Sequence, residues 1–309
     1  MKRPGRRQIW RLVRICISAG LLLWLFSRFD LEGLKTSLGQ LPLLVWIAAF
    51  LMMLTAQVLS SIRWWILSNA CAFPGNWRTY LGFYFVGMFF NLFLPTGIGG
   101  DLFKIHFLSR EEGKRIVAAS TVVADRLLGL TAMLLMGAVA VYLRPDLLPE
   151  PFPLMMLLAG GCILTAVLTL PLIKRLLTRL WPGLTPYFEL VSAIRERPGR
   201  LIPLSALSFS VQGLGIGAVA LLGTGMGIHL PTALYFLMVP LVALSTLIPI
   251  SFNGIGVREG AFVYLLGLKG IGAGAALGLG LLFFSVQVSI SLIGGICYAT
   301  GVHRRKVID

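Results

Sequence analysis

The chain has 309 residues, of which 57% are hydrophobic and only 13% are charged, and its formal net charge is +15. Charged residues make up about a quarter of an average soluble domain, so this composition excludes an ordinary soluble enzyme. The basic residues cluster in short segments beside apolar runs, which disfavours nucleic-acid binding and suggests affinity for anionic lipid headgroups. We therefore predict an all-α polytopic membrane protein of the cytoplasmic (inner) membrane, with residues 1–309 as a single membrane domain.

Apolar runs of about 20 residues, each able to cross a hydrocarbon core about 30 Å thick, recur along the chain. They predict six transmembrane helices near residues 9–28, 41–67, 115–143, 154–173, 203–224 and 272–300. The first follows a basic segment without a small-residue cleavage site, which favours an uncleaved helix over a signal peptide. Tryptophans near span ends, Trp64 and Trp65 among them, are expected to be interfacial anchors.

Two further apolar segments, 79–108 and 232–268, are interrupted by proline and glycine and are predicted to be broken hairpins. Lys and Arg concentrate in the N-terminal arm, in the predicted loop 174–200 and in the C-terminal tail. This distribution places both termini in the cytoplasm. The first hairpin then enters and leaves from the cytoplasmic side, and the second enters and leaves from the external side.

Two re-entrant hairpins that approach from opposite sides would form an inverted repeat, with one copy at about 9–143 and the other at about 154–300. The alternative is that both hairpins cross the membrane completely. That version leaves every orientation unchanged, so the charge distribution does not distinguish the two.

The interruptions in the two hairpins are candidate binding sites. Backbone that leaves the helix at membrane depth is tolerated only where it is buried in protein or lines a cavity. A pair of such breaks in corresponding positions points to the binding site of a transporter. The candidate residues are Asn91, Pro95, Gly97, Gly99, Gly100, Asp101 and Lys104 in the first hairpin, and Ser251, Asn253, Gly254, Gly256, Arg258 and Glu259 in the second.

The expected ligand of these breaks is an anion. A helix begins after each break, and the N–H groups of its first turn and its dipole suit a phosphate. Lys104, Arg126 and Arg258 are the cations available to complete the site. An isolated charge at this depth costs several kcal/mol, so pairing with the nearby acids is expected. These acids are Asp101, Asp125 and Glu259.

Several roles stay open for these charged residues. Asp125 and Arg126 could form a fixed ion pair that holds the third span against a hairpin. Asp101 could cap the helix that follows it or carry a proton. Gln212 and Gln287, in the fifth and last spans, could line a polar path, although close helix packing explains most of their small neighbours.

No metal or cofactor is expected. The cysteines and histidines show no metal-ligand spacing, and the glycines at 97–100 lack the lysine and strand of a nucleotide-binding loop. An enzyme would need a nucleophilic or acid–base set; the paired acids with Arg258 could form one, but no histidine lies near a serine or cysteine.

Three motifs follow one another along the chain. They are Asn91, Pro95, Gly97, Gly99, Gly100 and Asp101; then Ala118-Ala119-Ser120 with Asp125-Arg126-Leu127-Leu128-Gly129; then Pro249 with Gly254, Gly256, Arg258-Glu259-Gly260. In this order they resemble the transmembrane region of the lysylphosphatidylglycerol synthase family. Arg63-Trp64 also resembles an arginine that precedes the first hairpin in that family.

The resemblance covers nearly the whole chain and implies a flippase-like domain that moves lipid between leaflets. Full-length synthases carry a cytosolic aminoacyl-transferase domain as well. Because the chain ends at Asp309, shortly after the last predicted span, we do not expect it to lysylate lipid by itself.

The sequence therefore predicts a lipid transporter and no enzyme. The expected cargo is an anionic or aminoacylated phospholipid, or a polyprenyl-phosphate lipid. Two alternatives stay open: an integral-membrane enzyme that acts on lipid headgroups, and a membrane anchor for a cytosolic lipid-modifying transferase that docks on 174–202. A homo-oligomer is also compatible with the sequence.

Overall fold

The computed structural model describes residues 39, 41–71, 73, 75–93, 99–110, 114–196, 198–247, 251 and 253–301. Within these residues the chain is helical with short connections and has no strand, which confirms the all-α prediction. The predicted span 9–28 lies outside the described residues and stays a prediction. The α-helices are α3 Leu43–Ala70, α4 Trp77–Phe93, α5 Gly99–Ser109, α6 Arg115–Leu143, α7 Phe152–Leu180, α8 Thr185–Arg195, α9 Leu201–Gly225, α10 Thr232–Leu247, α11 Val257–Gly267 and α12 Ala273–Ala299.

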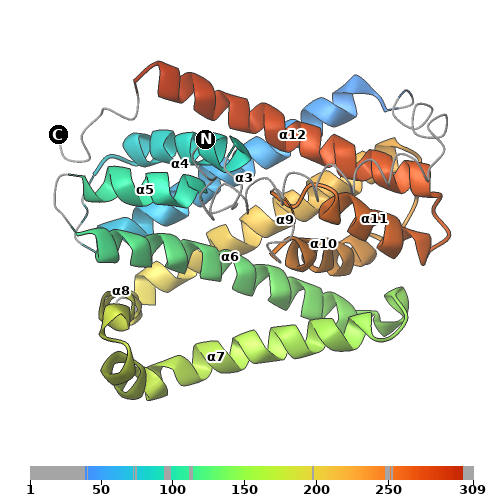
Figure 1. Ribbon diagram of the computed structural model, residues 1–309. Coiled ribbons are helices and arrows are strands. Elements are labelled where there is room, and N and C mark those ends of the chain that lie inside the picture. Colours follow the sequence, from blue (N-terminus) through green and yellow to red (C-terminus); the bar gives the residue numbers. More distant parts are fainter. Residues whose placement is uncertain are drawn as a thin grey trace, which may run out of the picture.

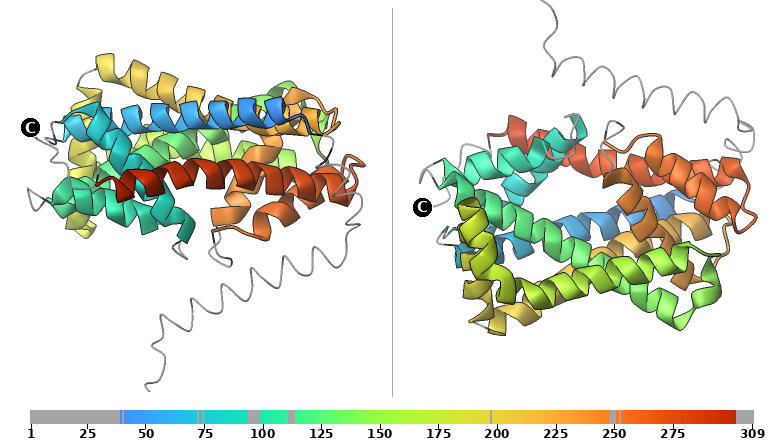
Figure 2. Two further views of the ribbon diagram at one scale, coloured as in Figure 1. Left: turned by 90° about the horizontal axis from the view of Figure 1, so that it is seen from above. Right: turned by 60° about the horizontal axis from the view of Figure 1, so that its bottom comes forward.

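Four of the described helices are long and apolar enough to cross a membrane: α3, α6, α9 and α12. They extend along the length of the molecule, α3 packing against α9 (Figures 1 and 2). Their positions match the spans predicted near 41–67, 115–143, 203–224 and 272–300. The chain is therefore a polytopic membrane protein, because several apolar helices of this length are excluded from water together.

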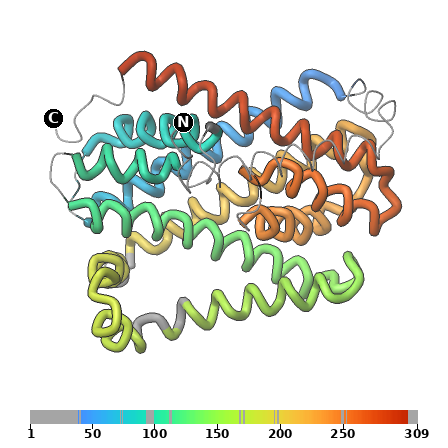
Figure 3. The backbone as a smooth tube through the Cα atoms, in the orientation of Figure 1, coloured from blue at the N-terminus to red at the C-terminus, as the bar shows by residue number. Residues whose placement is uncertain are grey.

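The remaining helices near the centre form two pairs. Helices α4 and α5 lie together at one end of the molecule, and α10 and α11 lie together at the other (Figures 1 and 3). Both α5 and α11 have 11 residues and begin near the middle of the molecule. At 1.5 Å per residue each is about 16 Å long, roughly half of a hydrocarbon core. Helix α4 packs against α12, and α10 packs against α6.

Glycine allows α4 to approach both of its neighbours. A Cβ added at Gly100 of α5 would lie 1.7 Å from the carbonyl oxygen of Gly87, and one added at Gly294 of α12 would lie 1.9 Å from that of Phe85. No side chain fits at either point. The backbone of α4 is therefore held between α5 and α12 by contacts that only glycine permits.

The prediction of a loop at 174–200 is wrong. Helix α7 continues to Leu180, and Thr185–Arg195 forms α8. Leu190 and Ile194 of α8 are buried against α3, α6 and α9 in a small apolar cluster. Three of the basic residues that suggested a loop, Lys174, Arg175 and Arg179, lie in the last turns of α7. In α8 the buried Leu190 and Ile194 are four residues apart, and this helical spacing gives the helix one face to bury.

Trp64 is not an interfacial anchor. Helix α3 extends beyond the predicted end at residue 67, so Arg63 and Trp64 lie inside the helix bundle. Trp64 is fully buried, and its Nε1–H donates to Thr121 Oγ1 of α6 at 3.1 Å. The neighbouring Arg63 is buried as well, because Asp125 neutralises its charge within the protein.

Candidate functional site

A cavity of about 680 Å³ occupies the centre of the molecule, between the two helix pairs. Its lining comes from α3, α6, α9 and α12 and from both pairs, α4–α5 and α10–α11. Apolar residues such as Met53, Met133 and Phe262 make up much of the wall. Its charged lining residues are Arg63, Lys104, Asp125, Arg126 and Arg258.

Arg63 and Asp125 form a buried ion pair on one wall. The Nε of Arg63 lies 2.7 Å from Oδ1 of Asp125, and both side chains are at most 6% exposed. Nη1 of the same arginine donates to Ser208 Oγ at 3.1 Å. The pair links α6 to α3 and α9, so Asp125 is engaged by a helix distant in sequence and not by its neighbour Arg126.

Asp101 lies beside two cations that line the cavity, Lys104 and Arg126. Arg126 donates to its Oδ2, and the Nζ of Lys104 lies 3.6 Å from its Oδ1. Lys104 also lies 3.7 Å from the ring centroid of Tyr84, close enough for a cation–π contact. The Asp101 carboxylate thus joins α5 to α6 and is directed at the two cations. The interpretation of Asp125 and Arg126 as an ion pair is therefore wrong, since each pairs with a different partner. The two cations also disfavour a capping role for Asp101.

In the described part of the first break, a side chain near the end of α4 accepts a hydrogen bond from the backbone at the start of α5. Oδ1 of Asn91, near the end of α4, accepts a hydrogen bond of 2.7 Å from the N–H of Gly100. Gly99 and Gly100 are buried. The expectation that this N–H is free for an anion is therefore wrong at Gly100. Pro95 and Gly97 lie outside the described residues.

In the second break, too, a side chain accepts a hydrogen bond from the backbone at the start of a helix. Oε2 of Glu259 accepts a hydrogen bond of 2.6 Å from the N–H of Gly256, so the acid caps the helix that contains it. Asn253, Gly254 and Gly256 all have positive φ, at 51°, 75° and 83°. A positive φ is uncommon for asparagine and persists where the surrounding structure enforces it. Ser251 is buried, and its Oγ has no hydrogen-bond partner among the described residues.

Arg258 differs from the other cations of the cavity. Its Nη2 donates to the carbonyl oxygen of Asn253 at 3.3 Å, and the guanidinium lies 5.5 Å from the centre of the Phe284 ring. The residue is only 8% exposed, yet its Nη1 has no hydrogen-bond partner among the described residues. Within these residues no carboxylate lies within ion-pair distance of it, because Glu259 is directed at the backbone of Gly256.

The charges in and beside the cavity do not balance. In the part of the chain that the structure describes, they consist of four cations and three acids, namely Arg63, Lys104, Arg126 and Arg258 with Asp101, Asp125 and Glu259. One positive charge is left over, and by geometry it belongs to Arg258. Burying a charge without a counter-ion costs free energy unless a ligand or water supplies the missing partner.

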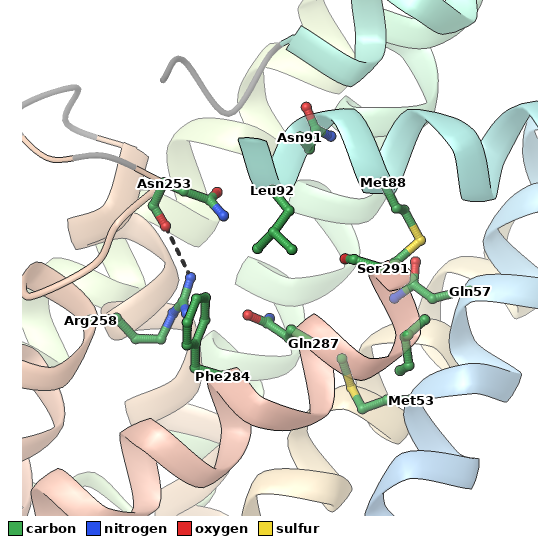
Figure 4. Close-up of a pocket in the computed structure, with 11 residues that line it drawn as sticks. Met53, Gln57, Met88, Asn91, Leu92, Asn253, Arg258, Phe284, Gln287 and Ser291 are labelled. Carbon is green, nitrogen blue, oxygen red and sulfur yellow. Dashed lines mark hydrogen bonds between the residues drawn. The ribbon is translucent and has the colours of Figure 1, made fainter. Parts of the chain in front are cut away.

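A smaller cavity of about 190 Å³ adjoins the large one and shares Gln57, Asn91, Arg258 and Gln287 with it. Figure 4 shows its side chains converging from α3, α4, α12 and the second break. The prediction missed Gln57 and the buried role of Arg63. Their signal was the spacing of Gln57, Ser60 and Arg63 along one face of an apolar span. Gln212 and Gln287, for which a place along a polar path was left open, both line the large cavity.

These features define the class of protein: a helical membrane protein in which long apolar helices and two pairs of shorter helices enclose a charged cavity. The chain belongs to the family described as lysylphosphatidylglycerol synthase TM region, whose model matches residues 11–295. This confirms the resemblance noted in its motifs and indicates a lipid-related function in the membrane. No curated protein sequence and no solved structure matches the chain significantly.

Proposed function

We propose that this chain is a lipid transporter, and not an enzyme, that moves an anionic lipid between the leaflets of the cytoplasmic membrane. The observation that carries the proposal is Arg258, a buried guanidinium that lines the cavity; among the described residues its Nη1 has no hydrogen-bond partner and no carboxylate lies within ion-pair distance. A lipid phosphate would supply the missing charge and acceptor. Arginine suits this role because its planar fork binds phosphate through two parallel hydrogen bonds.

The arrangement of the helix pairs supports the predicted re-entrant hairpins and inverted repeat. The order long helix, short pair, long helix occurs as α3, α4–α5, α6 and again as α9, α10–α11, α12. The two pairs lie at opposite ends, and each packs against the closing long helix of the other set. In transporters with this organisation, one repeat moves against the other around a site near the midplane. We propose the same movement here.

The acyl chains of a lipid also need a way out of the cavity. Three cavity-lining residues are exposed: the side chain of Arg126 by 52%, Leu127 by 36% and Leu247 by 62%. They belong to α6 and the end of α10. A headgroup could bind in the cavity while its acyl chains leave past these exposed residues and stay in the bilayer.

The loops support the predicted orientation. The end where α4 and α5 lie carries Arg78, Arg110, Lys114 and Arg115 in or beside its connections, whereas the opposite end carries Lys269 and Arg144, the latter paired with Asp146. The positive-inside rule then places the α4–α5 end in the cytoplasm.

The test is lipid movement by the purified chain in liposomes. Phospholipids and polyprenyl phosphates with a fluorescent group on the hydrocarbon chain are offered to the wild type, to Arg258→Gln and to Arg144→Gln. The last variant removes an arginine from an exposed surface pair and serves as the matched control. We expect movement with the wild type and the control and at least a tenfold loss with Arg258→Gln.

Undiminished movement with Arg258→Gln would show that the cargo path lies elsewhere. If the wild type moves none of these lipids, the transporter proposal fails. A membrane anchor for a cytosolic lipid-modifying enzyme would then be the better explanation, and the enzyme should co-purify with the chain.

A further inference from the structure

The small cavity beside Arg258 has a lining that differs from that of the large one. Its polar residues are Gln57, Asn91, Asn253, Arg258, Gln287 and Ser291. Apart from Arg258 they are all uncharged. Figure 4 shows Gln287 between Arg258 on one side and Ser291 with Gln57 on the other. A group bound to Arg258 would therefore have neutral amide and hydroxyl groups as its next neighbours.

Several of these polar groups have unused hydrogen-bonding capacity. Within the described part of the chain, no side chain or backbone group hydrogen-bonds to the side-chain amide of Gln57 or Gln287. Each amide offers two donors and one acceptor oxygen. Amides that face a cavity in this way can bind hydroxyl groups as donors and as acceptors, which a purely apolar or purely cationic pocket cannot do.

The cavities provide no carboxylate for an amine. The small cavity has no acidic lining residue, and the breaks carry no Asp or Glu at 94–98 or at 248–252. Asp125 is the acid that lines the large cavity, and Arg63 already occupies it. A cationic headgroup would therefore lose its hydration without gaining an ion pair, and it would lie near the unbalanced charge of Arg258.

We propose that the small cavity is a subsite for an uncharged, hydroxyl-bearing headgroup such as glycerol, joined to a phosphate on Arg258. The assignment rests on the proposed lipid transport and gives its substrate class: anionic polyol phospholipids are favoured and aminoacylated lipids are excluded. The volume supports a small polyol, since about 190 Å³ corresponds to roughly six water molecules at about 30 Å³ each.

The first measurement is binding by the purified full chain in detergent, by thermal-shift titration with dihexanoyl lipids. The probes are phosphatidylglycerol, lysylphosphatidylglycerol and phosphatidic acid, which has the phosphate without the polyol. We expect lysylphosphatidylglycerol to bind at least tenfold more weakly than phosphatidylglycerol. Gln287→Leu should weaken the binding of phosphatidylglycerol about 5- to 10-fold and leave the binding of phosphatidic acid unchanged, because only the polyol loses hydrogen bonds. An unchanged affinity for phosphatidic acid also shows that the variant is folded.

Two further variants sharpen the test. Gln212→Leu replaces an amide that lines the large cavity but not the small one. It should therefore leave the ratio of the affinities for phosphatidylglycerol and phosphatidic acid unchanged. Gln287→Glu places a carboxylate beside the subsite and should bring the affinity for lysylphosphatidylglycerol closer to that for phosphatidylglycerol.

The subsite proposal is overturned if wild type binds lysylphosphatidylglycerol as tightly as phosphatidylglycerol, or if Gln287→Leu weakens phosphatidylglycerol and phosphatidic acid equally. Lipid movement in liposomes separates this failure from that of the proposed function. Selective binding without movement would refute transport and keep the subsite. Movement that prefers the aminoacylated lipid would keep transport and refute the subsite.

Discussion

The buried cations of the cavity are stabilised in different ways. Arg63 has a carboxylate and a hydroxyl, and Lys104 has a carboxylate and an aromatic ring. Arg258 has one backbone carbonyl and the face of Phe284. Because a buried charge without a counter-ion is strongly unfavourable, the first two are suited to hold the structure and the third to bind a ligand.

The ion pair of Arg63 and Asp125 provides a direct test of the structural role assigned to Arg63. Asp125→Asn keeps the side-chain shape but leaves Arg63 charged and buried without an anion. We expect the free energy of unfolding to fall by about 3 kcal/mol, as is usual when one partner of a buried pair is removed. Reversible unfolding of the purified variant in mixed micelles measures the change.

The double variant Arg63→Gln with Asp125→Asn is the control for that pair. It removes both charges, so it should be more stable than Asp125→Asn alone. If the two substitutions instead add up as independent losses, the ion pair does not couple the helices and its structural role is refuted.

At the scale of elements, the position of α4 depends on two glycine contacts, with α5 at Gly100 and with α12 at Gly294. These contacts position the first break relative to the cavity. The site therefore depends on packing surfaces that carry none of its chemistry.

Gly294→Ala should destabilise the protein, because the new Cβ would lie 1.9 Å from the carbonyl oxygen of Phe85 and force α4 and α12 apart. Overpacking of this kind costs about 1–3 kcal/mol. The melting temperature of the purified chain measures it. Gly161→Ala in α7 is the matched control, since no atom lies within 4 Å of its added Cβ. That control should be neutral or more stable by about 0.5–1 kcal/mol. Equal melting temperatures for the two variants would contradict the packing role of Gly294.

At the scale of the whole molecule, the unequal charge of its two ends predicts which one faces the cytoplasm. Gly183, between α7 and α8, lies at the α4–α5 end, and Lys269, between α11 and α12, lies at the other. In a chain whose native cysteines are replaced by serine, we introduce Gly183→Cys or Lys269→Cys. Both positions are exposed.

A membrane-impermeant maleimide should label Lys269→Cys in intact spheroplasts and label Gly183→Cys only after permeabilisation. The reverse pattern would invert the orientation and place both predicted hairpin entries on the wrong sides. Labelling of both positions after permeabilisation serves as the control for their accessibility.

The helices and the breaks between them could be predicted from local composition. A run of apolar residues partitions into the bilayer whatever its neighbours are, so the spans at α3, α6, α9 and α12 were predictable within a few residues. Proline and glycine at 95–100 and 249–256 likewise interrupt a helix locally. The motifs within these breaks also indicated the family.

The partners of the charges were decided by the tertiary structure alone. Asp125 could have paired with Arg126, which follows it directly, but side chains of adjacent helix residues point in different directions. Packing instead brings Asp125 to Arg63 and Arg126 to Asp101. Glu259 caps its own helix, so among the described residues Arg258 has no carboxylate within ion-pair distance, which no spacing in the sequence indicates. Local hydropathy thus determined which segments are helices in the membrane. The balance of charge in the cavity depends on which helix faces meet, and only the folded chain decides that.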